Sequence, residues 1–228
     1  MRENQSVEIV AEILHGIGAS PLKLSVYPTA GGGLSFVGWK DSAAREISIR
    51  VRSALETVSV RLDDGAALRV LIDRDDFSGV ELDLCAATAL AAYSGRFDPA
   101  KLAGVALSAE LALDGRLRPV RGVVSLAEAA KARGARLLVV AKENRAEAEQ
   151  VGGIRVETPV LFSDLVDLLA RDLSGVGEFA LPRMDRDGAA AAWKSCREAV
   201  DGGARCLLLV GPPRAGKMTL ARILASRL

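Results

Sequence analysis

The sequence predicts an α/β protein followed by the beginning of a nucleotide-binding unit. From about residue 105 onward, strand-like and helix-like runs alternate, which is typical of an α/β arrangement. The stretch 82–94 is rich in alanine and almost wholly apolar, so we expect a buried helix there. Near the end of the chain, the apolar run 206–210 leads into Gly211-x-x-x-x-Gly216-Lys217, and a helix-like segment follows. Strand, glycine loop and helix are the order that a phosphate-binding loop needs.

Composition limits the classes of protein to which the chain can belong. Its 228 residues suffice for one large domain, or for one domain and a fragment of another. The 30 basic and 29 acidic residues nearly cancel, which argues against a nucleic-acid footprint over the whole protein, although a local basic patch stays open. Aromatic residues make up 4%, too few to suggest a stacking platform for single-stranded nucleic acid.

The three cysteines, Cys85, Cys196 and Cys206, are far apart and lie in apolar or helical surroundings. This spacing suits neither a metal site nor a disulfide framework, so we expect reduced core thiols. The first residues are polar, without the apolar core of a signal peptide, and no run is long enough for a membrane span. The sequence therefore predicts a cytoplasmic protein without membrane contact.

The first part of the chain is expected to alternate between strands and two helices. Apolar and alternating runs predict strands at 7–14, 22–27, 34–38, 58–62 and 68–72, with a glycine-rich turn at 29–33. The segment 41–55 predicts an amphipathic helix, in which Arg45, Arg50 and Arg52 form a solvated face or face a partner. The acidic stretch 73–79 predicts a turn, because its aspartates lack the regular spacing of a calcium loop.

The second part is expected to begin with a hairpin. Residues 105–113 and 116–120 predict its two strands, joined by the turn Asp114-Gly115. We then expect a helix over 123–133 ended by Gly134, a buried strand at 137–140, a short helix at 144–151, a short strand at 154–156 and a helix at 162–169. The polar stretch 173–187 predicts a linker, and a helix over 188–200 follows it.

The candidate nucleotide site consists of nine consecutive residues: Gly211, Pro212, Pro213, Arg214, Ala215, Gly216, Lys217, Met218 and Thr219. Its glycines allow the backbone to curl so that successive N–H groups point at a polyphosphate, and Lys217 brings a positive charge to the outer phosphates. Met218 stands where a Ser or Thr hydroxyl would hold magnesium, so ATP is the predicted cofactor and Mg²⁺ is doubtful. The alternative is a glycine-rich turn that only joins a strand to a helix.

The sequence ends at Leu228, after the helix 218–228. A nucleotidase needs an acidic residue that orders magnesium and groups that activate water, and these would follow later in the chain. We therefore expect a nucleotide site that has only been begun. Whether the chain is an enzyme stays open, and no catalytic or metal-binding residue is assigned.

Several motifs resemble one family in the order in which they occur. Residues 110–123, residues 33–38 followed by 41–46, and residues 201–203 leading to 207–213 resemble segments of the magnesium-chelatase-like AAA+ ATPases of the competence protein M type. The likeness runs from about Val7 to the end of the chain. It implies that 1–172 form a Lon-protease-like domain with the ribosomal protein S5 domain 2-like fold. It also implies that 173–203 form a linker and helix, and that 204–228 are the first strand, P-loop and helix of a truncated AAA+ motor.

The resemblance implies an ATP-binding protein with a Lon-like domain that serves for assembly or partner contact. It implies homo-oligomers if the parent motor is complete, and DNA as a partner, since members of the family act in DNA branch migration. The alternative is a stand-alone interaction domain that keeps a remnant P-loop. A Lon-like serine peptidase is the third and least supported reading.

The residues argue against the peptidase, which uses a Ser–Lys pair. Aligned on the helix 82–94, the serine position holds Glu81, and a looser alignment offers Ser78. The lysine position holds Val124, and Lys131 lies two helical turns further on, about 10 Å away. His15 lies among apolar neighbours, which favours a structural histidine.

Overall fold

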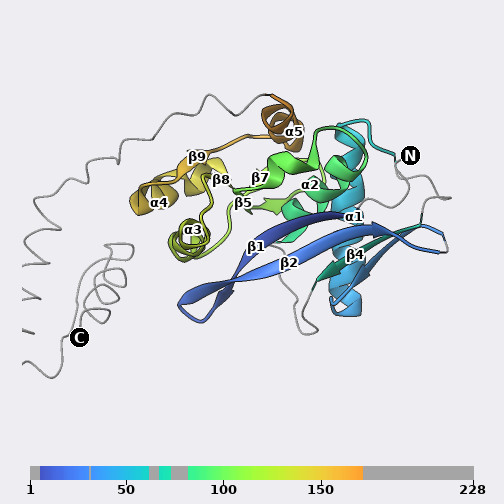
Figure 1. Ribbon diagram of the computed structural model, residues 1–228, viewed down its shortest axis with the longest axis horizontal. Helices are drawn as coiled ribbons and strands as arrows, with labels where there is room; N and C mark the ends of the chain where they lie inside the picture. The colour runs from blue at the N-terminus through green and yellow to red at the C-terminus, as the bar shows by residue number, and fades with distance from the viewer. Residues whose placement is uncertain (1–5, 31, 62–66, 73–81, 172–228) are drawn as a thin grey trace, which may run out of the picture. The chain divides into compact units, whose positions relative to one another are not determined.

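Two layers of β-sheet and the helices packed on them form the described part of the chain (Figure 1). A computed structural model describes residues 6–30, 32–61, 67–72 and 82–171. The chain divides into two units, Met1–Leu181 and Pro182–Leu228, and all described residues belong to the first. The mixed α/β class that the alternating pattern predicted is confirmed for this unit. The domain limits 1–172, 173–203 and 204–228 stay predictions.

The first sheet has the strand order β1-β2-β4-β3. Strands β1 (Val7–His15), β2 (Gly18–Pro28) and β4 (Leu68–Ile72) are antiparallel neighbours, and β3 (Leu34–Val37) runs parallel to β4. Alternate side chains of β1 and β2 are buried, among them Ile9, Ile13 and Leu24. This period of two turns one face of the sheet toward the core. These four predicted strands are confirmed.

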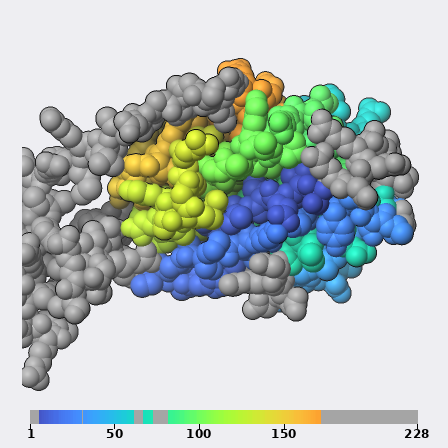
Figure 2. Space-filling model, in the orientation of Figure 1, coloured from blue at the N-terminus to red at the C-terminus, as the bar shows by residue number. Residues whose placement is uncertain are grey.

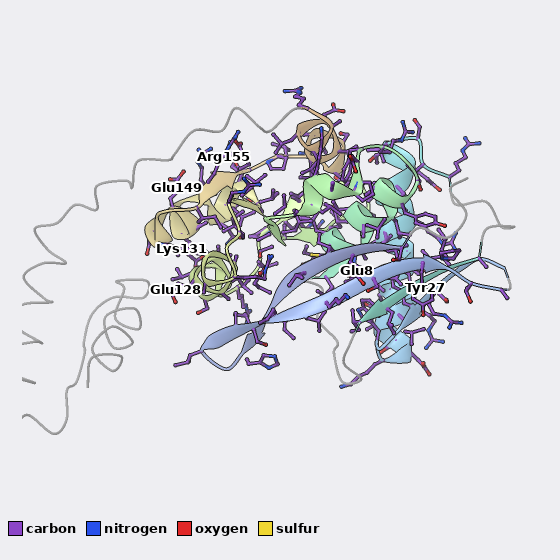
Figure 3. The ribbon with its side chains drawn as sticks, viewed as in Figure 1. Glu8, Tyr27, Glu128, Lys131, Glu149 and Arg155 are labelled. Carbon is purple, nitrogen blue, oxygen red and sulfur yellow. The ribbon has the colours of Figure 1, made fainter. Side chains whose placement is uncertain are left out.

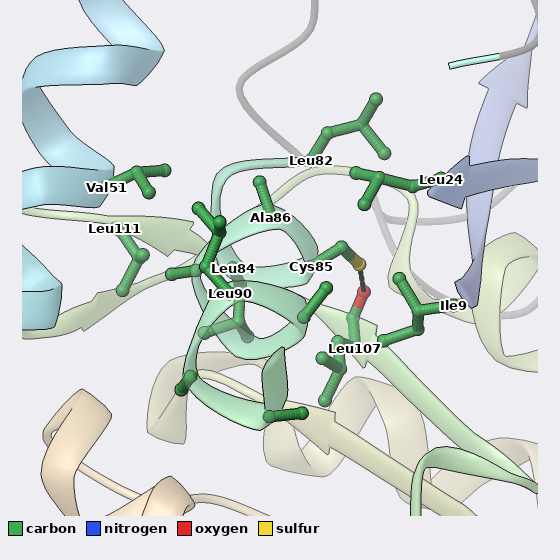
Figure 4. Close-up of a cluster of buried hydrophobic side chains, with 14 of the residues drawn as sticks. Ile9, Leu24, Val51, Leu82, Leu84, Cys85, Ala86, Leu90, Leu107 and Leu111 are labelled. Atoms are coloured by element: carbon green, nitrogen blue, oxygen red, sulfur yellow. Dashed lines mark hydrogen bonds between the residues drawn. The ribbon is translucent and has the colours of Figure 1, made fainter. Parts of the chain in front are cut away.

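Helices α1 (Asp41–Thr57) and α2 (Asp83–Tyr93) pack on each other; α1 contacts β3, and α2 contacts β1 and β2. In α2 every residue from Asp83 to Ala92 is buried (Figure 4). The small alanines let the surrounding elements approach this helix from all sides, so it lies inside the core as its composition predicted.

A parallel sheet with the order β5-β8-β9 forms the second layer. Its strands are β5 (Val105–Ser108), β8 (Leu137–Val140) and β9 (Arg155–Glu157). Helix α3 (Val123–Ala132) connects this layer with the first, because it packs on β5 and also on β1 and β2. In the space-filling view the yellow-green atoms of α3 lie against the blue atoms of the β1–β2 ribbon (Figure 2).

The remaining elements pack around the two clusters of buried apolar side chains that form the core. A short helix, η2 (Pro99–Leu102), follows α2, and helix α5 (Phe162–Ala170) packs on α1 and α2. The region predicted as one helix at 144–151 consists of three short pieces: η3 (Lys142–Asn144), α4 (Arg145–Ala148) and η4 (Glu149–Val151). The predicted strand 154–156 and helix 162–169 are present with bounds that differ by one residue.

The strand predicted at 58–62 is wrong over the described residues 58–61, which follow α1 as a turn. The backbone N–H of Val60 donates to the Leu55 carbonyl at 2.9 Å, and that of Ser59 donates to the Glu56 carbonyl at 2.9 Å. Ser59 has φ 54°, so this is the left-handed Schellman ending of a helix. In this ending the residues on both sides of Ser59, Val58 and Val60, are buried. Apolar residues at 58, 60 and 62 therefore alternate with polar ones, as they would in a strand.

The predicted hairpin is also only partly correct. Its antiparallel part is limited to β6 (Glu110–Leu111) and β7 (Leu117–Arg118), whereas β5 pairs in parallel with β8. Pro119 ends β7 because proline has no N–H to donate. A distant segment also bonds to this region: the Phe162 N–H donates to the Gly115 carbonyl in the turn at 2.8 Å, and the Leu117 N–H of β7 donates to the Val160 carbonyl at 3.0 Å.

Candidate functional site

The nine residues of the predicted nucleotide site, 211–219, lie outside the described residues. The same holds for Ser78, Glu81, the acidic stretch 73–79, Cys196 and Cys206. The roles assigned to them therefore stay predictions. The described residues do include Val124, which stands at the position that the lysine of a Lon-like site would take.

Val124 lies in the first turn of α3 and is half-buried. The residue before the helix, Gly122, has φ 67°, and a Cβ built on it would lie 2.9 Å from both δ-methyl groups of Leu14. The Ser125 hydroxyl donates to the Ile17 carbonyl at 2.8 Å. The first turn of α3 is thus pressed onto the β1–β2 hairpin, and its residues 123–126 carry no titratable side chain.

Two other residues were candidates for proton transfer in a Lon-like site. Lys131 is exposed on α3 (Figure 3), two turns from Val124, as the helix prediction required. His15 is the exposed last residue of β1, beside the β1–β2 turn. Neither residue lies in the first turn of α3, where the lysine of the Ser–Lys pair is expected.

A buried ion pair joins α1 to α2. The Arg50 Nε donates to Asp83 Oδ2 at 2.5 Å, its Nη2 donates to Oδ1 at 3.4 Å, and Glu46 lies one helical turn away at 3.5 Å from Nη1. Partial burial is the largest single effect and acts to lower the pKa of Arg50, but the hydrogen bonds and charges of Asp83, Glu46 and Glu110 together outweigh it and raise this pKa. For Arg50, the prediction of a solvated face is therefore wrong, because a buried carboxylate in the next helix binds it. That pairing leaves no signal in the helical pattern of α1.

A second ion pair lies where the two sheet layers meet, and no pattern in the sequence predicts it. The Arg133 Nε donates to Glu12 Oε1 at 2.8 Å, and its Nη2 lies 3.5 Å from the carbonyl oxygens of both Val10 and Val105. Val10 lies in β1 and Val105 in β5, so one guanidinium bridges the facing edges of the two sheets. Burial raises the pKa of Glu12, and the Arg133 contact lowers it by a smaller amount.

Cys85 also contacts β5 near the place where the two sheet layers meet. Its thiol donates to the Leu107 carbonyl of β5 at 3.6 Å (Figure 4). Burial raises the pKa of this thiol, and the nearby Glu12 charge raises it further. Cys85 is therefore an inert thiol in the core, as predicted. The carbonyls of Val105 and Leu107, which face away from β8, thus receive their hydrogen bonds from side chains.

The described ranges also bear on metal binding and on membrane spans. Within them, no group of three His, Cys, Asp or Glu side chains is arranged to hold a metal ion. No helix in these ranges has the length and apolar character to cross a membrane.

Comparisons with known proteins identify relatives of the chain. A family model described as subunit ChlI of Mg-chelatase matches residues 27–144. Among curated proteins, the uncharacterized protein YifB of Salmonella typhimurium is 30% identical over 220 residues, which cover 90% of this chain and 42% of that protein. The uncharacterized protein Rv2897c of Mycobacterium tuberculosis is 30% identical over 233 residues, covering 96% of this chain and 43% of that protein. The competence protein ComM of Haemophilus influenzae is 30% identical over 222 residues, covering 90% and 43% respectively. The chain spans less than half the length of these curated relatives.

Proposed function

Because this chain belongs to the family of the ChlI subunit of magnesium chelatase, we propose that it binds ATP through residues 211–219. The family is ATP-dependent in general. The observation that carries the proposal is Gly211-x-x-x-x-Gly216-Lys217 directly after an apolar run. In this arrangement backbone N–H groups surround the phosphates, the positive end of the following helix faces them, and Lys217 neutralises the outer charge.

Met218 separates nucleotide binding from magnesium binding in this proposal. A thioether is a weak acceptor and a poor ligand for a hard cation, so Met218 does not replace the usual hydroxyl. The hydroxyl of Thr219 lies one residue later, about 100° further round a helix. We therefore expect ATP to bind with little help from Mg²⁺.

Calorimetric titration with ATP, with and without Mg²⁺, tests this proposal. Lys217→Ala should weaken binding about 10- to 100-fold, since a hydrogen bond to a charged group contributes about 1.5–3 kcal/mol. Lys142→Ala, an exposed lysine of the first unit, is the matched control and should leave the affinity unchanged. Met218→Ser should increase the effect of Mg²⁺, whereas Thr219→Ala should not change it.

The outcomes separate the proposal from the alternative. Saturable binding that is lost in Lys217→Ala supports a formed phosphate loop. No binding by the unaltered chain contradicts it and favours an interaction domain with a remnant P-loop. A large effect of Mg²⁺ that disappears in Thr219→Ala would mean that Thr219 has taken over the metal, against our expectation.

For the first unit we propose a Lon-like domain that has no peptidase activity and serves in assembly or partner contact. The apolar first turn of α3, with Val124 in the lysine position, supports this, because a serine nucleophile needs a base to take its proton. Labelling with a serine-directed fluorophosphonate is the test. Labelling that disappears in Ser78→Ala would contradict the proposal.

DNA and homo-oligomerisation stay proposals that follow from the family resemblance. Fluorescence anisotropy with labelled DNA and sedimentation with and without ATP measure them. Two exposed arginines are engaged by carboxylates of this chain: Arg116 pairs with Asp114 at 3.2 Å, and Arg145 pairs with Glu149 at 2.7 Å.

A further inference from the structure

The end of helix α5 is held by a side chain from a distant part of the chain. The Lys101 ammonium donates to the carbonyl of Ala170 at 2.7 Å and to the carbonyl of Arg171 at 2.7 Å. Ala170 is the last residue of α5, and Arg171 is the last described residue before the region 172–228. The contact therefore lies where the chain leaves the described part of the first unit.

Lys101 is fixed at its base by the core. It lies in η2, which has Pro99 at its start, and the Asp98 side chain accepts a hydrogen bond from the Ala100 N–H at 3.0 Å. The next residue, Leu102, is buried in the main core. Proline and the capping aspartate fix the backbone, so the lysine stem starts from a rigid position.

The carbonyls that Lys101 binds are ones that a helix leaves unpaired. The last carbonyl groups of a helix have no partner within it and carry its partial negative charge. The last turn of α5 has no basic residue of its own, and Asp167 adds negative charge one turn before the end of the helix. A cation from outside the helix therefore meets both needs, hydrogen bonding and charge.

We propose that Lys101 is a positioning residue that holds the end of α5 against the rest of the first unit. The last turn of α5 is then part of the rigid unit, and displacement of the chain after Arg171 does not unwind it. Lys101 thus connects the end of α5 to η2, and Leu102 of η2 is buried in the core, in addition to the packing of α5 on α1 and α2. This role is independent of the proposed function, because it involves neither nucleotide nor P-loop.

Amide hydrogen exchange of the full chain tests this proposal. In Lys101→Met, the amides of residues 168–171 should exchange about three- to tenfold faster, as expected when hydrogen bonds from a charged donor are lost at a partly exposed site. Tryptic cleavage after Arg171 should accelerate by a similar factor. Lys101→Arg should restore slow exchange, since a guanidinium also donates to two carbonyls.

Two controls keep the result unambiguous. Lys142→Met removes an exposed lysine from another short helix and should leave the exchange of residues 168–171 unchanged. The amides of β8 report the whole unit, so faster exchange there in Lys101→Met would indicate general destabilisation. Unchanged exchange at 168–171 in Lys101→Met, or an equal acceleration at 168–171 and in β8, would overturn the proposal.

Discussion

Gly122 holds a position that only glycine fits, and it shows how a single residue fixes the packing of α3. Its φ of 67° is left-handed, and its missing Cβ leaves room for Leu14 at the end of β1. We expect Gly122→Ala to lower the free energy of unfolding by about 2–4 kcal/mol, from backbone strain and from displacement of Leu14. Urea denaturation measures the loss.

Gly16→Ala is the matched control for this prediction. Gly16 has φ 58°, almost the same backbone conformation, but nothing lies within 4 Å of the Cβ that alanine would add. Its substitution should cost only the left-handed conformation, about 1 kcal/mol. Equal losses in the two variants would mean that the contact with Leu14 has no energetic effect.

Single residues also show what the sequence could not reveal. Burial of Cys85 was predictable, because its apolar neighbours are adjacent in the chain. The partner of Arg50 is Asp83, 33 residues away, and that of Arg133 is Glu12, 121 residues away. Helical spacing identifies a charged face but contains no information on which carboxylate will be buried against it. Such pairs follow from the tertiary arrangement alone.

At the scale of elements, the end of α1 offers a test of the corrected secondary structure. Ser59 occupies the left-handed position of the Schellman ending, which glycine adopts without steric strain. We expect Ser59→Gly to raise the free energy of unfolding by about 0.5–1 kcal/mol and to raise Tm. Calorimetry measures this change.

Ser94→Gly serves as the comparison, because Ser94 also follows a helix but has φ −76°. There glycine relieves no strain and only increases the freedom of the unfolded chain, so stability should fall slightly. A strand at 58–61 would predict the opposite sign for Ser59→Gly, since glycine weakens strands. The experiment therefore distinguishes the turn from the strand that the sequence suggested.

Elements were predictable where their pattern is local. The period of two in β1 and β2 and the apolar run of α2 indicated the correct structure, because each follows from burial on one face or on all faces. The hairpin at 105–120 misled, because an Asp-Gly turn between apolar runs does not tell whether the first strand pairs across the turn or with β8. The pairing of β5 with β8, some 30 residues later in the chain, depends on the tertiary arrangement of the sheet, which a local pattern does not contain.

At the scale of the whole molecule, the Glu12–Arg133 pair joins the two sheet layers. The pKa of Glu12 is raised in the folded protein, so this form binds the proton more tightly than the unfolded chain, whose pKa is near 4.5. The stability that protonation contributes is complete below the unfolded pKa and is lost as the pH rises through the folded one. We expect the unaltered chain to lose stability relative to Glu12→Gln as the pH rises above 4.5.

Arg133→Met should make this dependence steeper, because it leaves the buried carboxylate without its cation. Near neutral pH the free energy of unfolding of Arg133→Met should be about 3 kcal/mol below that of the unaltered chain, and this difference should shrink toward pH 4.5. Lys131→Met, on the exposed side of the same helix, should follow the unaltered chain at every pH. Urea denaturation between pH 4.5 and 7.5 measures all four proteins, and a pH-independent difference for Glu12→Gln would contradict the prediction.

For the nucleotide site, in contrast to the buried ion pairs, the sequence identifies residues that the structure does not describe. Its glycines and lysine are contiguous, so the sequence alone names its residues, whereas the described structure ends at Arg171. The P-loop assignment therefore depends on the motif and on the family, and the calorimetric titration decides it.

The complete burial of α2 has a consequence for synthesis on the ribosome. The helix ends at Tyr93, but β5 begins at Val105 and α5, which covers another side, begins at Phe162. At 5–20 residues per second, about 3–14 s pass between the synthesis of Tyr93 and that of Phe162. Throughout that interval an alanine- and leucine-rich segment is without part of its covering. During synthesis the nascent chain therefore exposes apolar surface of α2 that the folded unit buries.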